Sequence, residues 1–335
     1  MPDSYGCFGP AKMLWVIGCD EAGYGPPLGA FTQGSVALFL PGSTGAIEDS
    51  WAAYPELFRK RRGAARARPG VLPLVVDDSK VMTQLASGMD HMGALWPVLF
   101  GYPYKQKNTL KDLLDWAHLP DHTTFRDDPT LVENFPISWV FEDGLLENAR
   151  SALHKNGLAD CRARISMVSP AVFNQMIDQH QNKSAVLEKG WQSHIRWWLH
   201  QLPGDEPIVI LSDRLGGKKC YAGIFQEALG AKGLVQVIRE DDNQCTYRCL
   251  GTDREIMLIV SPKADSKYLP VAAASMLAKH LRELSMEMVN RYWMERVPNL
   301  KPTAGYPEDG KRFYAEIQST MARSGVNPDH VWRKR

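Results

Sequence analysis

The chain has 335 residues, of which 44% are apolar and 23% charged, a balance that excludes wholesale disorder. Its 39 Lys and Arg residues nearly balance 38 Asp and Glu residues, so the formal charge of +1 leaves only local patches to attract a polyanion. No apolar run reaches the roughly 18 residues that cross a bilayer. Residues 1–12 lack the layout of a secretory signal, and six cysteines are too sparse for a disulfide scaffold. We expect reduced thiols, a cytoplasmic location and no membrane partner.

The first 80 residues contain three segments typical of strands. Met13–Cys19 is a short apolar, β-branched run, Phe31–Leu40 is a second, and Val71–Val76 is a third. The segment Gly23–Gly29, between the first two, is rich in Gly and Pro and is expected to bend. Residues 47–68 carry Trp and Tyr side chains at helical spacing, which predicts a helix there.

Residues 85–164 show the least regular pattern, and we interpret them as an insertion or small subdomain. Beyond them the pattern alternates between strands and helices, which predicts a mixed α/β sheet with helices on its faces. A helix is expected over 169–202, with an interruption at Gly190. The other expected helices are Leu110–Trp116, Leu145–His154, Tyr221–Leu229 and Pro270–Met294, and the other expected strands are Pro207–Asp213, Leu234–Ile238 and Arg254–Val260.

Four carboxylates follow expected strands. Asp20 and Glu21 come after the first strand, Asp213 ends another, and Asp265 lies just past a strand that ends at residue 260. Functional groups gather beyond the strand ends of open α/β sheets, and clustered carboxylates repel one another unless cations neutralise them. Oxygen ligands favour Mg²⁺ or Mn²⁺. The alternative is that these acids are solvated residues or helix caps.

Five motifs, in this order along the chain, resemble those of ribonuclease HII, the type 2 ribonuclease H family. The similar stretches cover about residues 13–40, 71–82, 165–215 and 255–318. The motifs are Gly18-Cys-Asp-Glu-Ala-Gly-Tyr-Gly-Pro-Pro-Leu-Gly29, Asp78-Ser-Lys80, the strand Ile208–Asp213, the stretch Lys263–Lys279 with Arg282, and Gly305-Tyr-Pro307.

This resemblance implies a ribonuclease H-like α/β fold with a central mixed β-sheet flanked by helices, an inserted region and a helical C-terminal part. The expected division places the catalytic domain in residues 1–84 and 165–285. Residues 85–164 then form the insertion or small subdomain, and residues 286–335 form the helical C-terminal region.

The resemblance also implies a metal-dependent endonuclease that hydrolyses the RNA strand of RNA/DNA hybrids, or of a duplex with an embedded ribonucleotide. Two divalent ions, Mg²⁺ or Mn²⁺, would be held by Asp20, Glu21, Asp213 and Asp265, and the products would carry a 3′-hydroxyl and a 5′-phosphate. Two alternatives stay open: a nucleic-acid-binding module of the same fold that does not cut, and a nuclease for another structured nucleic acid.

The resemblance assigns substrate contacts to Gly23 and Gly25, to Ser79 and Lys80, and to Tyr306. Glycine lets the backbone approach a ribose closely, and contact with the 2′-hydroxyl distinguishes RNA from DNA. The family has Arg between the two glycines, whereas this chain has Tyr24, which cannot make a forked, charge-assisted contact with phosphate. An altered junction preference is therefore expected.

Several cationic segments have two interpretations. Arg214 and Lys218, around two glycines, bind a second phosphate or lie in a solvated turn. Arg59–Arg68 is a nucleic-acid arm or a solvated helix end, and Trp332–Arg335 is a basic tail. Cys245 and Cys249 lack a second ligand pair for zinc, and the pair His118 and His122 is interrupted by Pro120, so we expect no metal at either place.

Overall fold

The computed structural model describes residues 13–42, 47, 50–61, 72–85, 87–117, 128–130, 132, 134–139, 144–155 and 158–334. Its centre is a seven-stranded sheet in the order β5-β2-β1-β6-β9-β8-β7. Strand β1 pairs antiparallel with β2 and parallel with β6, and β6 pairs parallel with β9, so the predicted mixed sheet is confirmed. The strands are β1 (Met13–Ala22), β2 (Phe31–Pro41), β5 (Asp160–Val168), β6 (Ile208–Ser212), β7 (Leu234–Glu240), β8 (Cys245–Leu250) and β9 (Ile256–Val260).

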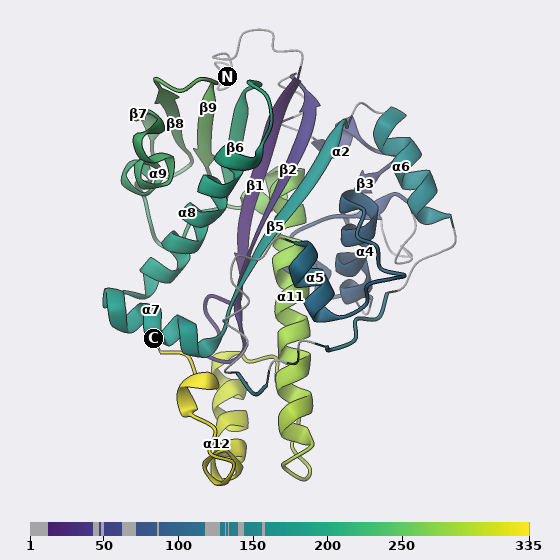
Figure 1. The fold of residues 1–335 in the computed structure, drawn as a ribbon, viewed down its shortest axis with the longest axis vertical. Helices are drawn as coiled ribbons and strands as arrows, with labels where there is room; N and C mark the ends of the chain where they lie inside the picture. Colours follow the sequence, from purple (N-terminus) through teal and green to yellow (C-terminus); the bar gives the residue numbers. More distant parts are fainter. Residues whose placement is uncertain are drawn as a thin grey trace.

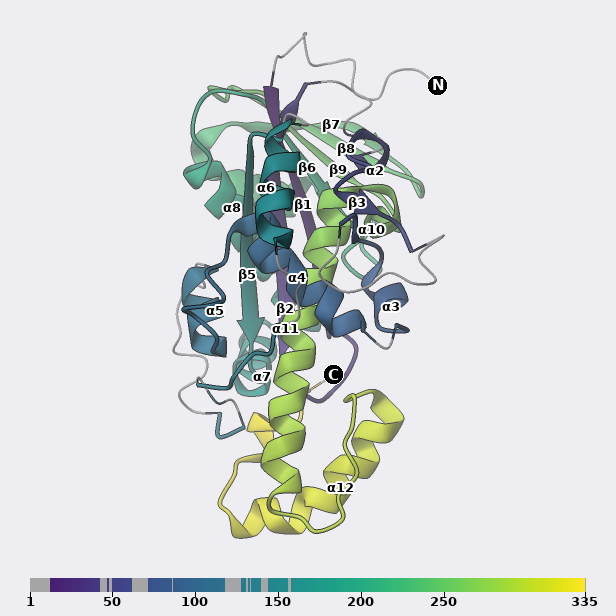
Figure 2. The same ribbon diagram turned by 90° about the vertical axis from the view of Figure 1, so that its right-hand side faces the viewer.

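Helices cover both faces of this sheet (Figures 1 and 2). One face packs against α7 (Pro170–His180), α8 (Lys183–Gln201) and α9 (Ala222–Leu229). The other packs against α11 (Leu269–Met294) and α4 (Gly88–Phe100). Neighbouring residues of β1 belong to the two different cores, because successive side chains of a strand point to opposite faces. The predicted flanking helices are therefore confirmed.

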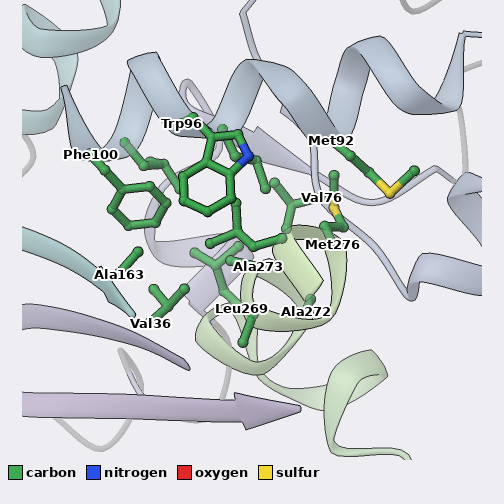
Figure 3. Close-up of a cluster of buried hydrophobic side chains, with 14 of the residues drawn as sticks. Val36, Val76, Met92, Trp96, Phe100, Ala163, Leu269, Ala272, Ala273 and Met276 are labelled. Carbon is green, nitrogen blue, oxygen red and sulfur yellow. The ribbon is translucent and has the colours of Figure 1, made fainter. Parts of the chain in front are cut away.

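The backbone of α11 lies directly on the sheet at two glycines. A Cβ built on Gly18 would lie 2.1 Å from the backbone of Pro270, and one on Gly34 would lie 2.5 Å from the carbonyl oxygen of Ala274. The side of α11 away from these strands carries Leu269, Ala273 and Met276, which pack with residues of α4 (Figure 3). The small alanines and the two glycines together bring α11 close to β1 and β2.

The insertion shares this core. The large side chains Met92, Trp96 and Phe100 of α4 point toward α11 and the sheet (Figure 3). Two further helices of the region, α5 (Leu110–Trp116) and α6 (Leu145–Lys155), match the predicted ranges within a residue. The division of the chain into a catalytic domain, an insertion and a C-terminal region remains our proposal, and its boundary at residue 286 falls inside α11.

Residues 47–68 do not form the single helix that the spacing predicts. Instead, α2 (Ser50–Ala53) is one turn long, and Phe58 lies in β3 (Phe58–Arg59), which pairs with β4 (Leu74–Val75). Trp51 is buried, and its indole N–H donates a hydrogen bond to the carbonyl oxygen of Val76, 2.9 Å away. A short helix followed by a strand therefore buries the aromatic side chains that the sequence spacing had assigned to one helix. The cationic residues 62–68 lie outside the described residues, as do His118 and His122.

The predicted interruption at Gly190 is wrong. Helix α8 runs unbroken through Gly190, because the glycine leaves room for the side chain of Gln33: a Cβ there would lie 1.6 Å from its amide oxygen. The break falls earlier, where Gln181 has a left-handed backbone (φ 51°) and the side chain of Asn182 caps α8. Strand β8, which contains Cys245 and Cys249, was not predicted.

The C-terminal part continues from α11, which extends beyond the sheet to pack beside α12 (Pro307–Arg323) (Figure 2). A short turn of helix, η3 (Pro328–His330), then brings the chain end back to α7 (Figure 1). In the described part of the chain, every helix is too short or too polar to span a bilayer. The five cysteines described there are all free thiols.

Candidate active site

Asp20 and Glu21 lie within β1, in its last three residues, and not after it as predicted. Asp20 pairs with Gly34 of β2, and Glu21 with Gln33. Because side chains alternate along a strand, the two acids leave opposite faces of the sheet. Asp20 takes the face of α11 and forms a hydrogen bond with Ser275 of that helix. The strand continues past the acids because Thr32 still pairs with Ala22.

Asp213 and Asp265 come to the same edge of the sheet through parallel strands. Strand β6 lies between β1 and β9, and Asp213 is the residue after its end. The backbone N–H groups of Arg214 and Lys263 both donate to Oδ1 of Asp213, at 2.7 and 3.1 Å. Lys263 has a left-handed backbone (φ 57°), and this turn starts α10 (Ala264–Lys267), which holds Asp265. The predicted gathering of acids beyond β6 and β9 is thus built from one reversal of the chain.

The four acids form one electrostatic cluster. The pKa of Glu21 is raised to about 7, mainly by burial and to a smaller extent by the charges of Asp213 and Asp265. Burial also raises the pKa of Asp265 to about 6, with Asp78 and Asp213 adding to the effect. Burial and the charge of Glu21 raise the pKa of Asp20 well above its ordinary value. The positive charge of Lys80 lowers the pKa values of Glu21 and Asp265 and so offsets part of this effect.

The donor set fits a hard divalent cation, because it consists of carboxylate oxygens whose negative charges are poorly neutralised by the protein. Within the described residues, however, no group of three or more His, Cys, Asp or Glu side chains is arranged so that it could hold a metal ion. The acids therefore share an electrostatic environment without forming a closed coordination shell in this structure.

The Asp78-Ser-Lys80 motif lies at the start of α3 (Ser79–Met82). Asp78 is the N-cap, and its Oδ1 accepts a hydrogen bond from the N–H of Lys80, 2.8 Å away. Ser79 is buried, and its Oγ lies within hydrogen-bond distance of Oγ of Ser275, at 3.0 Å. Ser79 thus points toward α11 and the hydroxyl that bonds Asp20, whereas the exposed Lys80 faces the acid cluster.

The segment Gly23–Gly29 forms a bend after β1. Gly23 has a positive φ of 80°, and a Cβ there would lie 2.5 Å from the side chain of Arg282. Gly25 is exposed, with no atom within 4 Å of its Cβ position. Tyr24 packs edge-on against Phe31, and Nζ of Lys183 lies 4.9 Å from the centre of its ring. Tyr24 is therefore part of the wall between the glycines and α8.

Tyr306 follows a loop that Arg282 connects to the bend. Arg282 is buried, and its Nη2 donates to the carbonyl oxygens of Leu28 at 3.4 Å and Ala304 at 3.1 Å. One guanidinium thereby joins the loop before Tyr306 to the glycine bend. The ring of Tyr306 is 54% exposed, with Nζ of Lys279 at 6.0 Å, so it is accessible to a ligand.

Arg214 and Lys218 are already engaged with protein groups. Arg214 donates to the carbonyl oxygen of Asp241 at 2.9 Å, and Lys218 forms an ion pair with Glu188 at 3.0 Å. Gly216, between them, has the positive φ of a turn. Among the residues that the structure describes, neither side chain pairs with an acid of the cluster, and a role in phosphate binding remains a proposal.

Sequence reasoning missed four residues of this site: Asp78, Glu188, Lys263 and Ser275. Asp78 was visible as part of a motif, and its acidic side chain next to Lys80 was the signal that it adds charge to the cluster. Ser275 stands out as the one hydroxyl in a run of alanines. Lys263 acts through its backbone, and Glu188 lies far away in sequence on α8, so neither had a local signal.

Comparison with known proteins gives the following matches. The family model of ribonuclease HII matches residues 235–329, a stretch that contains Asp265 and Tyr306. RNase HII of Archaeoglobus fulgidus, solved as a complex with PCNA, is 17% identical, with a TM-score of 0.40 over 96% of this chain and 95% of that chain. Ribonuclease H2 of Pyrococcus horikoshii OT3 is 16% identical, with a TM-score of 0.42 over 95% and 92% of the two chains.

Bst-RNase HIII, solved in complex with Mn²⁺, is 14% identical, with a TM-score of 0.43 over all of this chain and 70% of that chain. No curated protein matches. The match of the ribonuclease HII family model confirms the predicted resemblance over residues 235–329, and the mixed sheet flanked by helices agrees with the predicted fold class.

Proposed function

We propose that this protein is a metal-dependent endonuclease of the ribonuclease H type, which hydrolyses the RNA strand of an RNA/DNA hybrid. The observation that carries the proposal is the cluster of Asp20, Glu21, Asp213 and Asp265, in which burial and mutual repulsion raise the pKa values of three acids. An arrangement that is this costly for the folded protein is typical of functional sites. We include a cytoplasmic location in the proposal because the cysteines are sparse and the described ones are free.

The four acids would hold two divalent ions, Mg²⁺ or Mn²⁺. When bound, the ions supply an activated water and neutralise charge on the phosphate, which gives a 3′-hydroxyl and a 5′-phosphate. The protein's own part is to place the oxygens. Oδ1 of Asp213 is fixed by two backbone N–H groups, and Asp20 is fixed through Ser275. Lys80 is the cation that would meet the substrate phosphate next to the acids.

Recognition of the RNA strand would fall to the glycine bend and to Tyr306. The exposed Gly25 leaves the backbone open to a ribose, and the exposed ring of Tyr306 offers a surface on which a sugar or base can pack. At position 24, this chain has the neutral aromatic side chain of Tyr24 where the ribonuclease HII family has a cationic Arg. We therefore propose that the protein cleaves a continuous RNA/DNA hybrid faster than it cleaves at an RNA–DNA junction.

The test is a cleavage assay with four labelled substrates: a hybrid, a DNA duplex with one ribonucleotide, duplex DNA and branched DNA. With Mg²⁺ or Mn²⁺ we expect cutting of the hybrid, and Asp213→Asn should lower the rate by a factor of about 10³ or more because a metal ligand and charge are lost. The matched control is Asp242→Asn, an exposed acid that pairs with Lys219 at the surface. If the wild type binds the hybrid tightly without cutting it, the result would favour the non-catalytic binding module. Cutting confined to branched DNA would favour a nuclease for another structured nucleic acid.

A further inference from the structure

The C-terminal end of the chain lies directly behind the glycine bend. Trp332 forms a β-bridge with Leu28, and the backbone N–H of Arg333 donates to the carbonyl oxygen of Pro27 at 2.8 Å. Asn174 of α7 fixes the same segment from the other side: its side chain donates to the carbonyl oxygen of Trp332 at 2.9 Å and accepts from the N–H of Lys334 at 2.7 Å. The tail is therefore part of the folded core and not a loose basic extension.

The guanidinium of Arg333 is buried beneath the bend. Its side chain is 1% exposed, its Nη2 donates to the carbonyl oxygens of Gly23 and Pro26, and the group lies 4.7 Å from the ring centre of Phe173. Within the described residues, no acid forms an ion pair with it. Burial, with the charge of Arg282, lowers the pKa of Arg333 to about 9. A buried cation that contacts carbonyl oxygens and an aromatic ring, without a carboxylate partner, is a costly way to stabilise a fold.

The sequence of the bend explains why it needs an outside donor. Pro26 and Pro27 have no backbone N–H, so the bend cannot satisfy its carbonyl groups through the hydrogen bonds of an ordinary turn. Arg333 supplies these donors. It also sets the direction of a peptide group: in a trans peptide the C=O and the following N–H point opposite ways, so a Gly23 carbonyl turned toward Arg333 directs the N–H of Tyr24 away from it.

We propose that Arg333 is a positioning residue for the glycine bend: it holds the carbonyl groups of Gly23 and Pro26 so that the N–H of Tyr24 faces outward as a donor to the ribose or phosphate of the bound RNA strand. This inference rests on the proposed function for the identity of the ligand. It assigns the basic C-terminal segment to the substrate site, although its charged group never touches the substrate.

The experiment compares Arg333→Ala, Arg333→Lys and the control Lys334→Ala in the full chain. Lys334 is the adjacent cation, and its Nζ pairs with Asp178 at the surface, so the control removes the same charge without touching the bend. The first readout is hydrogen exchange of the backbone amide of residue 333, whose N–H donates to the carbonyl oxygen of Pro27 and is protected while the tail stays attached to the bend. Arg333→Ala should speed exchange of this amide about tenfold, Arg333→Lys less, and Lys334→Ala not at all.

The second readout is the kinetics of hybrid cleavage. Arg333→Ala should raise KM about tenfold with kcat changed less than threefold, since the acid cluster is untouched and only a substrate contact is misplaced. If Arg333→Ala does not fold, Asn174→Ala, which releases the tail while keeping the guanidinium, should show the same changes at smaller size. Unchanged exchange and unchanged KM in the folded variants would overturn the inference. A wild-type protein that cuts no substrate would instead refute the proposed function, while the exchange data would still test Arg333.

Discussion

The backbone N–H of Lys263 donates a hydrogen bond to Oδ1 of Asp213, 3.1 Å away, and so fastens the turn after β9 to the end of β6. Because Lys263 adopts a left-handed backbone, the chain reverses there and α10 starts with Asp265 beside Asp213. Two acids that lie 52 positions apart in the sequence therefore meet through one main-chain contact. The acid cluster depends on this turn as much as on the acids.

The raised pKa of Glu21 makes the metal-free protein less stable at high pH. A folded-state pKa of about 7 against an ordinary 4.5 means that the folded protein binds this proton more tightly, so the stabilisation is complete below about pH 4.5 and lost as pH rises through 7. Glu21→Gln should therefore raise the free energy of unfolding at pH 8 by about 1 to 3 kcal/mol, with little effect near pH 4. Urea unfolding in EDTA at both pH values measures this, with the exposed Glu308→Gln as control. Destabilisation at pH 8 would contradict it.

Cleavage should depend jointly on pH and metal concentration. Asp265 and Glu21, with pKa values of about 6 and about 7, must lose their protons to act as ligands, so the rate at low Mg²⁺ should rise about tenfold or more from pH 6 to 8. Divalent ions compete with these protons, and higher Mg²⁺ should shift the profile to lower pH. Rates at several Mg²⁺ concentrations give this shift. A profile that does not move with Mg²⁺ would count against these two acids as ligands.

Gly34→Ala should destabilise the protein by about 2 kcal/mol or more, because the new methyl group would meet the backbone of α11 and neither strand nor helix has room to move. The matched control is Gly223→Ala within α9, where nothing lies within 4 Å and a gain of about 0.5 to 1 kcal/mol is expected from helix propensity. Chemical denaturation of both variants provides the comparison. Equal stability of the two would show that α11 does not rest on β2 as described.

Tyr306→Ala should weaken substrate binding without affecting folding. The ring is half exposed, so its loss costs the fold little, whereas a stacked aromatic contributes about 1 to 3 kcal/mol to binding of a nucleotide. We expect KM for the hybrid to rise about tenfold. Tyr306→Phe, which keeps the ring, should retain most of the affinity. Steady-state kinetics and thermal unfolding of both variants separate the two effects, and an unchanged KM for the alanine variant would exclude Tyr306 from the substrate site.

The sequence predicted best where local patterns and the buried sheet agree. Strands β1, β2 and β6 coincide with apolar runs, and Pro270 marks the N-terminus of α11, so the positions of these elements were predicted within a few residues. The carboxylates were found because they follow these strands. Prediction failed where tertiary packing, and not local sequence, determines the secondary structure. Gly190 breaks no helix because Gln33 fills the space beside it, and residues 47–68 were read from aromatic spacing that two different backbones can satisfy.

The site residues show the same division. Asp20, Glu21, Asp213 and Asp265 were recognisable from type and place, and they lie close enough to influence one another's pKa values, while their role as metal ligands stays a prediction. The ion pair of Lys218 with Glu188 could not be predicted, because Lys218 lies in a loop and its partner lies on α8, 30 positions earlier in the sequence. Nor could the burial of Arg333, since a basic chain end has no pattern that distinguishes a solvated tail from one tied to a distant loop.

The continuity of α11 limits how the protein can be shortened. The helix has 26 residues and spans about 39 Å, from beside Asp265 to its packing against α12. Its outer half, including Trp293, shares a core with Leu28 of the glycine bend and with Phe313 of α12. A recombinant fragment that stops near residue 285 would leave this core open to water and the glycine bend without its support. Any minimal version made for crystallography should keep everything from β1 through Lys334.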